Sequence, residues 1–241
     1  MKSLALLALL PLGVAAQTLT VATDVWPPFR MEVDGEIVGY DIDVLAEVAQ
    51  RTGIEFSVER MPWARALRSI EYGESDLMVG LAYTRERDEY TDYLYYVYKS
   101  CRPGFYGDAS ITDTINTYED LYQHRIGYVR DSAYFPRFDN DEQLFKVSTA
   151  REEQLLQMVS RGNIELLIGT DCQVDYELMQ RPDLGLAKAP WQPAERIDLY
   201  YGFTEQRQLV AEKDKIEAAL QAMTNDGFFD ALYKEYFGDP N

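Results

Sequence analysis

The sequence predicts an α/β fold of two lobes, each a mostly parallel sheet flanked by helices. Strand and helix signals alternate from Gln17 onward, a pattern that favours parallel strands joined by helical crossovers. The signals fall into two series of about 85 and 100 residues, so we expect two cores with a ligand cleft between them. The composition, 46% hydrophobic and 27% charged over 241 residues, is that of a globular chain able to bury both cores.

The first series is defined by the spacing of its apolar residues. Ile42, Leu45 and Ala49 recur at helical spacing, and Asp41 is expected as the N-cap of that helix. The expected elements are, in order, a strand at 19–23, a helix from 42 to its stop at Gly53, an alternating strand at 54–59, a helix from 63 to its stop at Gly73, and a buried strand at 76–80.

The second series follows a tyrosine-rich extended stretch at 94–106, where we expect β-propensity and half-burial to account for the tyrosines ahead of the alternative, a ligand-stacking face. Its expected elements are a helix at 118–123, a strand at 125–129, a helix at 151–161, a strand at 164–169, a helix at 173–180 and a strand at 199–203. Two helices, at 210–225 and 228–237, close the chain, and Asp226-Gly227 is the turn expected between them.

Charge and residue counts argue against several classes of function. Asp and Glu number 41 against 23 Lys and Arg, giving a formal charge of −18. A field of that sign repels phosphate backbones and anionic headgroups, so we expect no nucleic-acid partner and no membrane-surface binding. His124 is the one histidine, and with two cysteines it leaves too few ligands for a zinc cluster. The sequence has no G-x-S-x-G turn, and no cofactor, metal or catalytic residue is expected.

Residues 1–16 are typical of a cleaved signal peptide. Lys2 precedes an apolar run from Leu4 to Leu12, and small residues follow up to Ala16. The run is shorter than the roughly 20 apolar residues that span a bilayer. We therefore expect cleavage after Ala16 and export of the mature chain. Export puts Cys101 and Cys172 in an oxidising compartment, where they are candidates for a disulfide, although the sequence alone leaves open whether they are bonded or free.

Several short segments in a fixed order resemble one protein family. They are Trp26-Pro27-Pro28-Phe29, Gly39-Tyr40-Asp41-Ile42-Asp43, Asp76-Leu77-Met78-Val79-Gly80, Thr84-Arg85-Glu86-Arg87, Tyr201-Gly202-Phe203 and Asp226-Gly227-Phe228-Phe229. The chain is similar to periplasmic solute-binding proteins of family 3, the substrate-binding type of polar amino-acid ABC transporters. The resemblance implies a type II periplasmic-binding-protein fold with two hinge crossings. It places lobe 1 at residues 18–100 plus 206–241 and lobe 2 at residues 105–203, with the ligand cleft between them.

Arg87 is the first candidate for the ligand site. It follows the strand ending at Gly80, where α/β sheets bind ligands, and a guanidinium can hold a carboxylate through two parallel hydrogen bonds. The resemblance makes Arg87 the carboxylate clamp, with Thr84 adding a hydroxyl or a backbone N–H. The other expected lobe 1 contributors are Trp26, Phe29, Tyr40, Trp63, Gly80 and Ala82. The four aromatic residues are expected as pocket walls, and packing in the core of lobe 1 is the competing interpretation.

Lobe 2 is expected to contribute Arg130 and Ser132, which follow the strand at 125–129 and open a short helix. Thr170 and Asp171 follow the next strand, near the place where the family holds an ammonium group with an acidic side chain. The sequence departs from the family there, because Thr170 aligns with that acid and Ala82 replaces the usual serine or threonine. A buried ammonium group without acceptors is unfavourable, so a carboxylate-bearing ligand is expected ahead of a standard α-amino acid.

The function expected is that of a non-catalytic, monomeric periplasmic binding protein. It would capture a small carboxylate-bearing solute, an amino acid or a related organic acid, by lobe closure and deliver it to an inner-membrane ABC permease. Two alternatives stay open on the same fold. One is a periplasmic dehydratase or lyase resembling cyclohexadienyl dehydratase, with Asp131 or Asp171 as the acid or base. The other is a stand-alone sensory binding protein that docks to a receptor.

Overall fold

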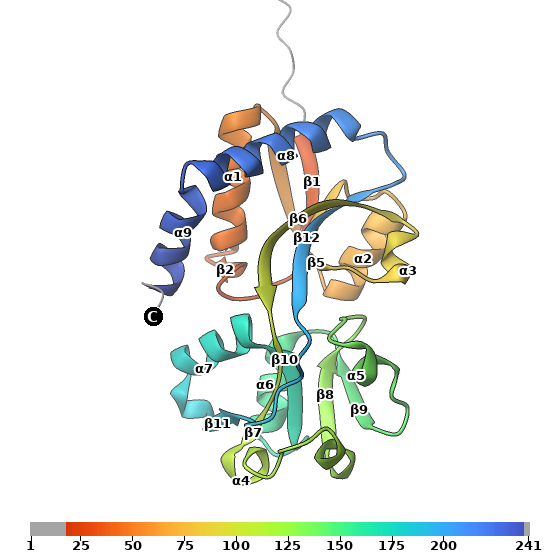
Figure 1. The fold of residues 1–241 in the computed structure, drawn as a ribbon, viewed down its shortest axis with the longest axis vertical. Coiled ribbons are helices and arrows are strands. Elements are labelled where there is room, and N and C mark those ends of the chain that lie inside the picture. The colour runs from red at the N-terminus through yellow and green to blue at the C-terminus, as the bar shows by residue number, and fades with distance from the viewer. Residues whose placement is uncertain (1–17, 239–241) are drawn as a thin grey trace, which may run out of the picture.

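The computed structural model describes residues 18–238, and its ribbon shows two lobes one above the other (Figure 1). The expected signal peptide at residues 1–16 lies outside the described residues. Each lobe is built on a five-stranded sheet. None of the helices among the described residues is long and apolar enough to cross a membrane.

The sheet of lobe 1 has the strand order β4-β1-β5-β12-β6. Its strands are β1 (Thr18–Thr23), β4 (Glu55–Arg60), β5 (Leu77–Ala82), β6 (Thr91–Cys101) and β12 (Ile197–Thr204). The three strands β4, β1 and β5 are parallel, whereas β12 and β6 run antiparallel. The sheet is therefore mixed rather than mostly parallel, because the strands next to the hinge join it in the opposite direction.

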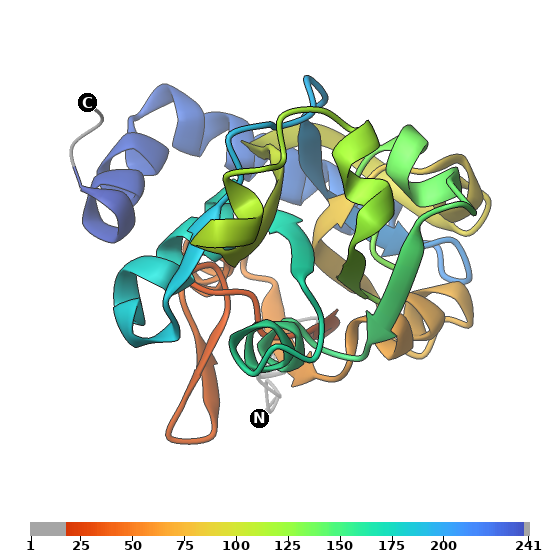
Figure 2. The same ribbon diagram turned by 90° about the horizontal axis from the view of Figure 1, so that it is seen from below.

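Helices cover both faces of this sheet. They are α1 (Tyr40–Thr52), α2 (Trp63–Glu71), the short α3 (Arg85–Asp88), α8 (Val210–Asn225) and α9 (Phe228–Phe237). Alternate residues of a strand serve opposite cores: Val21 packs with the cluster under α1 and α8, and Ala22 with the cluster under α2. A small hairpin of β2 (Met31–Val33) and β3 (Glu36–Val38) projects from the body of the molecule (Figure 2).

The sheet of lobe 2 repeats the mixed arrangement in the order β11-β7-β10-β8-β9. Its strands are β7 (Pro103–Asp108), β8 (Arg125–Val129), β9 (Phe145–Thr149), β10 (Leu166–Thr170) and β11 (Leu186–Lys188). Its helical segments are α4 (Ala109–Thr112), η1 (Glu119–Gln123), α5 (Pro136–Asn140), α6 (Glu152–Ser160), η2 (Asp171–Asp175), α7 (Tyr176–Gln180) and η3 (Pro182–Leu184).

The chain passes between the two sheets twice, from β6 into β7 and from β11 into β12 (Figure 1). Arg102 alone separates β6 from β7. Residues that follow β1 in lobe 1 and β8 and β10 in lobe 2 line a common cavity, so the carboxyl ends of these strands face one another between the lobes.

Two local expectations were wrong. Arg130–Ser132 forms a turn with Asp131 at φ 60°, and the next helix, α5, begins at Pro136, a residue suited to the first helical position. Helix α1 begins at Tyr40 after Gly39, so Asp41 lies inside the first turn and caps nothing. It is instead fully buried and paired with Arg30.

Candidate functional site

A cavity of about 100 Å³ lies between the lobes and is lined from both of them. Lobe 1 supplies residues that follow β1, begin α2 or end β5, and lobe 2 supplies residues that follow β8 and β10 or begin α6. Its polar and charged lining is Asp24, Arg30, Arg87, Ser132, Tyr134, Arg151, Glu152, Thr170 and Gln173, and its apolar walls include Trp26, Trp63 and Leu199. Strand ends and helix starts thus converge on one site.

Arg87 reaches across this cleft from lobe 1. Its side chain is 5% exposed, and Thr84 fixes the start of α3 by accepting the Arg87 backbone N–H at 3.1 Å. The guanidinium donates through Nη1 to the Ala82 carbonyl at 2.8 Å and through Nη2 to the Asp131 carbonyl of lobe 2 at 2.7 Å. It also lies 5.9 Å from the centre of the Trp63 ring. Desolvation lowers the pKa of Arg87.

No carboxylate pairs with Arg87 within residues 18–238. A buried guanidinium held only by carbonyl oxygens keeps a full positive charge to offer to an anion. Thr84 does not line the cleft cavity; it positions Arg87 through the helix cap rather than facing the cavity itself.

Of the four candidate aromatic residues, two lie in the cleft and two in the core. Trp26 and Trp63 line the cavity. Phe29 is 0% exposed and Tyr40 3% exposed, and both pack beneath Phe237 of the last helix, with ring centres 5.6 and 6.1 Å from it. The expectation that Phe29 and Tyr40 form pocket walls is therefore corrected, because α9 closes over both rings.

A buried ion pair that the sequence analysis missed lies beside the cavity. Nη1 of Arg30 contacts Oδ2 of Asp41, and Nε donates to the Asp24 carbonyl at 3.1 Å. Gly80 has φ +75°, and a Cβ there would lie 2.6 Å from Nη1 of Arg30. The glycine is thus needed both for its backbone conformation and for the close approach of the guanidinium. Burial raises the pKa of Asp41 to about 6 even though Arg30 opposes the shift.

The residues expected from lobe 2 separate into those inside and those outside the cavity. Ser132 and Thr170 line it, as does Ala82 across the cleft. Arg130 is exposed and lines a different surface depression beside Thr149. Asp171 accepts the backbone N–H of Arg102 at 2.8 Å and so fixes the hinge crossing rather than the cavity wall. Arg130 and Asp171 are therefore corrected as ligand-site candidates.

Two acidic residues of the cavity were missed. Asp24 follows β1 and accepts the backbone N–H of Val25 at 2.8 Å and that of Trp63 at 3.2 Å, which satisfies the start of α2. Burial raises the pKa of Asp24. Glu152 is the first residue of α6, separated from the end of β9 by two residues, and burial raises its pKa to about 8. Arg130 was a candidate because it follows a strand and precedes a helix. The same reasoning applied to the segment after β9 would have identified Glu152.

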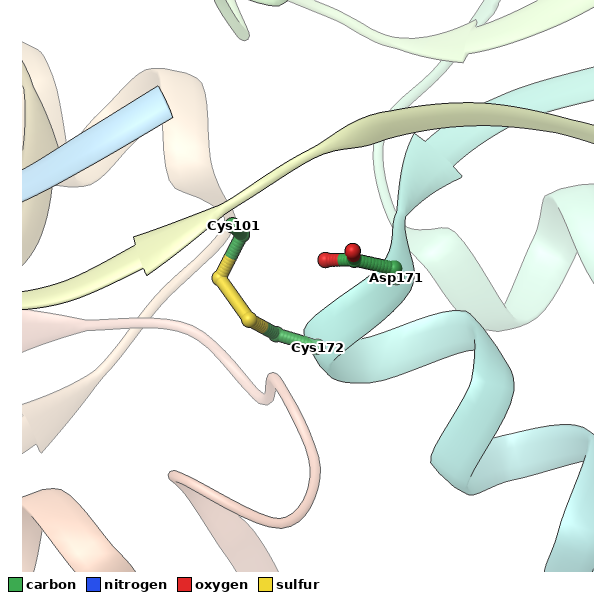
Figure 3. Close-up of side chains that lie close together, drawn as sticks. All are labelled: Cys101, Asp171 and Cys172. Carbon is green, nitrogen blue, oxygen red and sulfur yellow. A yellow bond between two sulfur atoms is a disulfide. The ribbon is translucent and has the colours of Figure 1, made fainter. Parts of the chain in front are cut away.

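Cys101 and Cys172 form a disulfide with Cα atoms 5.6 Å apart (Figure 3). It joins the end of β6 to the turn after β10, beside Asp171. Three potential metal ligands thus lie close together, but both sulfurs are used by the disulfide, and an Asp171 oxygen already accepts the Arg102 N–H. The cluster fits a structural link at the hinge and not a metal centre.

Comparison with known proteins agrees with this architecture. A family model described as bacterial extracellular solute-binding proteins, family 3, matches residues 19–239. A probable histidine-binding protein of Campylobacter jejuni is 21% identical over 232 residues, which cover 92% of this chain and 86% of that protein.

Solved structures share the fold at similarly low or lower sequence identity. An ancestral arginine-binding protein bound to arginine matches with a TM-score of 0.81 at 20% identity, covering 92% of this chain and 98% of that one. A histidine kinase sensor domain with similarity to periplasmic binding proteins matches with a TM-score of 0.82 at 14% identity, covering 92% and 97%. These likenesses confirm the two-lobed fold expected from the sequence.

Proposed function

The chain belongs to the bacterial extracellular solute-binding proteins of family 3, and on that premise we propose that it captures a small carboxylate-bearing solute between its lobes for an ABC importer. It would act in the periplasm and without catalysis. The lobes would close over the solute by a hinge movement at the two crossings.

The observation that carries this proposal is the buried, carboxylate-free Arg87 in the cleft. Its two forked nitrogens contact carbonyl oxygens of both lobes, Ala82 in lobe 1 and Asp131 in lobe 2. A solute carboxylate would meet the guanidinium at the junction of the lobes, and bidentate hydrogen bonding would give it both affinity and orientation. Trp26 and Trp63 add apolar walls that exclude water. The relatives named for binding arginine and histidine support a ligand that carries a carboxylate.

One observation favours an enzyme of the dehydratase or lyase type as a second candidate. Glu152, with its pKa raised to about 8, lines the cleft and could act as a general acid. Asp131 contributes its carbonyl to Arg87, and Asp171 lies at the hinge, so the acid or base would be Glu152 rather than either of them. Incubation with prephenate and arogenate distinguishes the two functions, because turnover of either compound would identify an enzyme and exclude a purely non-catalytic binding protein.

The likeness to a kinase sensor domain keeps a sensory role as a third candidate. Transport and sensing share the same cleft and differ in the membrane partner. Co-purification from membranes with a permease supports transport, and co-purification with a receptor in its place supports sensing.

The test of the binding role is a thermal-shift screen against amino acids and organic acids. A ligand at 100 times its Kd stabilises the folded state by about 2.7 kcal/mol, a rise of several degrees in Tm. Arg87→Lys keeps the charge but loses the bidentate geometry, so we expect at least tenfold weaker binding. Arg85→Ala, an exposed neighbour, is the control and should bind like the wild type. Undiminished affinity in Arg87→Ala would overturn the assignment.

A further inference from the structure

The two strands next to the hinge, β6 and β12, divide their packing between the two lobes. At the end of this ribbon that is far from the hinge, Leu94 and Tyr201 are buried in the core under α1 and α8. At the hinge end, Cys101, Ile197 and Leu199 are buried in a core of lobe 2. Strand pairing therefore places the whole ribbon in the lobe 1 sheet, whereas packing places its hinge end in lobe 2.

The ladder of this ribbon is irregular where the packing changes from one lobe to the other. Residues 95–98 of β6 lie opposite a single residue of β12, Tyr200, because the register shifts between Leu199 and Tyr201. The register of β12 against β5 shifts at the same place, before Gly202. A bulge disrupts the ladder locally and bends the strand. The ribbon is therefore weakest at the boundary between the two cores.

The crossing from β6 to β7 is, in contrast, held firmly to lobe 2. The disulfide joins Cys101 to Cys172 in η2, the turn after β10 (Figure 3). Beside it, the Arg102 N–H donates to Oδ1 of Asp171 at 2.8 Å, and the Asp171 N–H donates to the Arg102 carbonyl at 2.9 Å. Strand β7 then pairs directly with β10. The crossing thus has little freedom to bend.

The turn that receives these links also lines the solute cavity. Thr170 directly precedes Asp171, Gln173 directly follows Cys172, and the side chains of Thr170 and Gln173 both line the cavity. A bend at Arg102 would pull on this turn through the disulfide and displace both side chains. A bend within the β6–β12 ladder leaves the turn where it is.

We propose that the Cys101–Cys172 disulfide sets the position of the hinge. It joins the crossing and the cavity-lining turn into one rigid unit with lobe 2, so the lobes move by bending the ladder at residues 95–98 and Tyr200. Cys172 and Asp171 are then positioning residues, since they hold the turn in place while the lobes move. The inference goes beyond the binding role, because it concerns the lobe movement itself and requires no particular solute.

The boundary of the moving unit passes through the pair formed by Leu199 and Ala82. Leu199 is buried in the lobe 2 core, and Ala82, the last residue of β5, packs against that core from lobe 1. Arg87 donates to the Ala82 carbonyl on one side of this boundary and to the Asp131 carbonyl on the other. A bend at Tyr200 therefore changes the separation of Arg87 from Asp131 without disturbing the turn after β10.

The test measures the distance between the lobes by pulsed electron paramagnetic resonance, with no solute present. Spin labels on Lys215→Cys of α8 and Ser160→Cys of α6 report on lobe 1 and lobe 2, and both positions are exposed. Two matched glycine variants loosen the two alternative bending points. Val97→Gly changes an exposed residue in the irregular part of β6, and Arg102→Gly changes the crossing.

With the disulfide intact, we expect Val97→Gly to widen the distribution of label-to-label distances about twofold and Arg102→Gly to leave it unchanged. When Cys101→Ala/Cys172→Ala removes the link, Arg102→Gly should widen the distribution as well. A measurement that needs no variant is hydrogen–deuterium exchange of the wild type, in which residues 95–98 should exchange about tenfold faster than residues 100–102.

Three results would overturn the inference. The first is equal widening by Val97→Gly and Arg102→Gly with the disulfide intact, since the crossing would then bend as readily as the ladder. The second is an Arg102→Gly variant that stays unchanged after the disulfide is removed, because the link would then not be what holds the crossing. The third is exchange at 100–102 as fast as at 95–98. All three are measured without solute, so they leave the proposed function to its own test.

Discussion

Removing the disulfide between Cys101 and Cys172 should destabilise the protein markedly. The two residues are 71 positions apart, and closing a loop of that length removes chain entropy equivalent to about 4 kcal/mol from the unfolded state. The loop contains β7, β8, β9 and β10, which is most of the lobe 2 sheet. We expect the double variant Cys101→Ala/Cys172→Ala to lose about 3–5 kcal/mol in its free energy of unfolding. Alanine is chosen because it adds no buried hydroxyl group.

The assay is urea unfolding followed by circular dichroism, with wild-type protein under reducing conditions as an independent route to the open bond. For a chain of this size each kcal/mol shifts Tm by about 2–4 °C, so a fall of roughly 10 °C should accompany the loss. A loss below about 1 kcal/mol by both routes would show that the unfolded chain gains little freedom when the link opens, which contradicts the loop-entropy reasoning.

Two further predictions concern buried charge. Asp41→Asn leaves Arg30 buried without its carboxylate and should lower the free energy of unfolding, measured in urea, by about 3–5 kcal/mol. Glu47→Gln breaks the more exposed pair with Arg51 and should lower it by less than about 1 kcal/mol. Equal losses in the two variants would show that burial does not strengthen the dependence of Arg30 on its partner. The folded chain holds the Glu152 proton up to a pKa of about 8 but the unfolded chain only to its ordinary value of 4.5, so between these values the folded state binds more protons and stability falls as pH rises. The free energy of unfolding of Glu152→Gln relative to wild type should therefore increase from pH 5 to pH 8, and a flat difference would contradict the shifted pKa.

The sequence predicted the parts of the site that depend on local signals. Arg87 follows a buried strand and lies within the short helix α3, and it lines the cleft cavity. Trp26, Trp63, Ser132 and Thr170 lie at similar strand or helix ends. These positions follow from the rule that strand ends in α/β sheets meet at one edge, which needs no knowledge of distant contacts.

The sequence did not predict the burial of side chains that are covered by elements distant in the chain. Phe29 and Tyr40 are covered by α9, almost 200 residues further on, and nothing near them in sequence shows this. In a chain with 41 acidic residues, Asp41 and Glu152 resemble solvated carboxylates or helix caps. Their burial is decided by packing between elements, which periodicity does not report.

The placement of Glu152 also changes the interpretation of Thr170. From the sequence, the threonine stood where an acid was expected, and this argued against a nitrogen-bearing ligand. In the structure an acidic side chain reaches the same cavity from α6. A sequence alignment compares Thr170 only with the residue at the same position in the family, so it does not show that Glu152, from another element, lines the same cavity.

The strand order of lobe 1 leaves β4 and β6 at the two edges of its sheet, where a second chain could add a strand and start aggregation. On β6 the register against β12 jumps between Lys99 and Leu94, so the tyrosine-rich segment bulges out of the regular ladder. On β4 the exposed side chains are Glu55, Ser57 and Glu59, and a copy of this strand would bring like charges together. Both edges thus disfavour strand addition, although one of them carries a long, Tyr-rich strand.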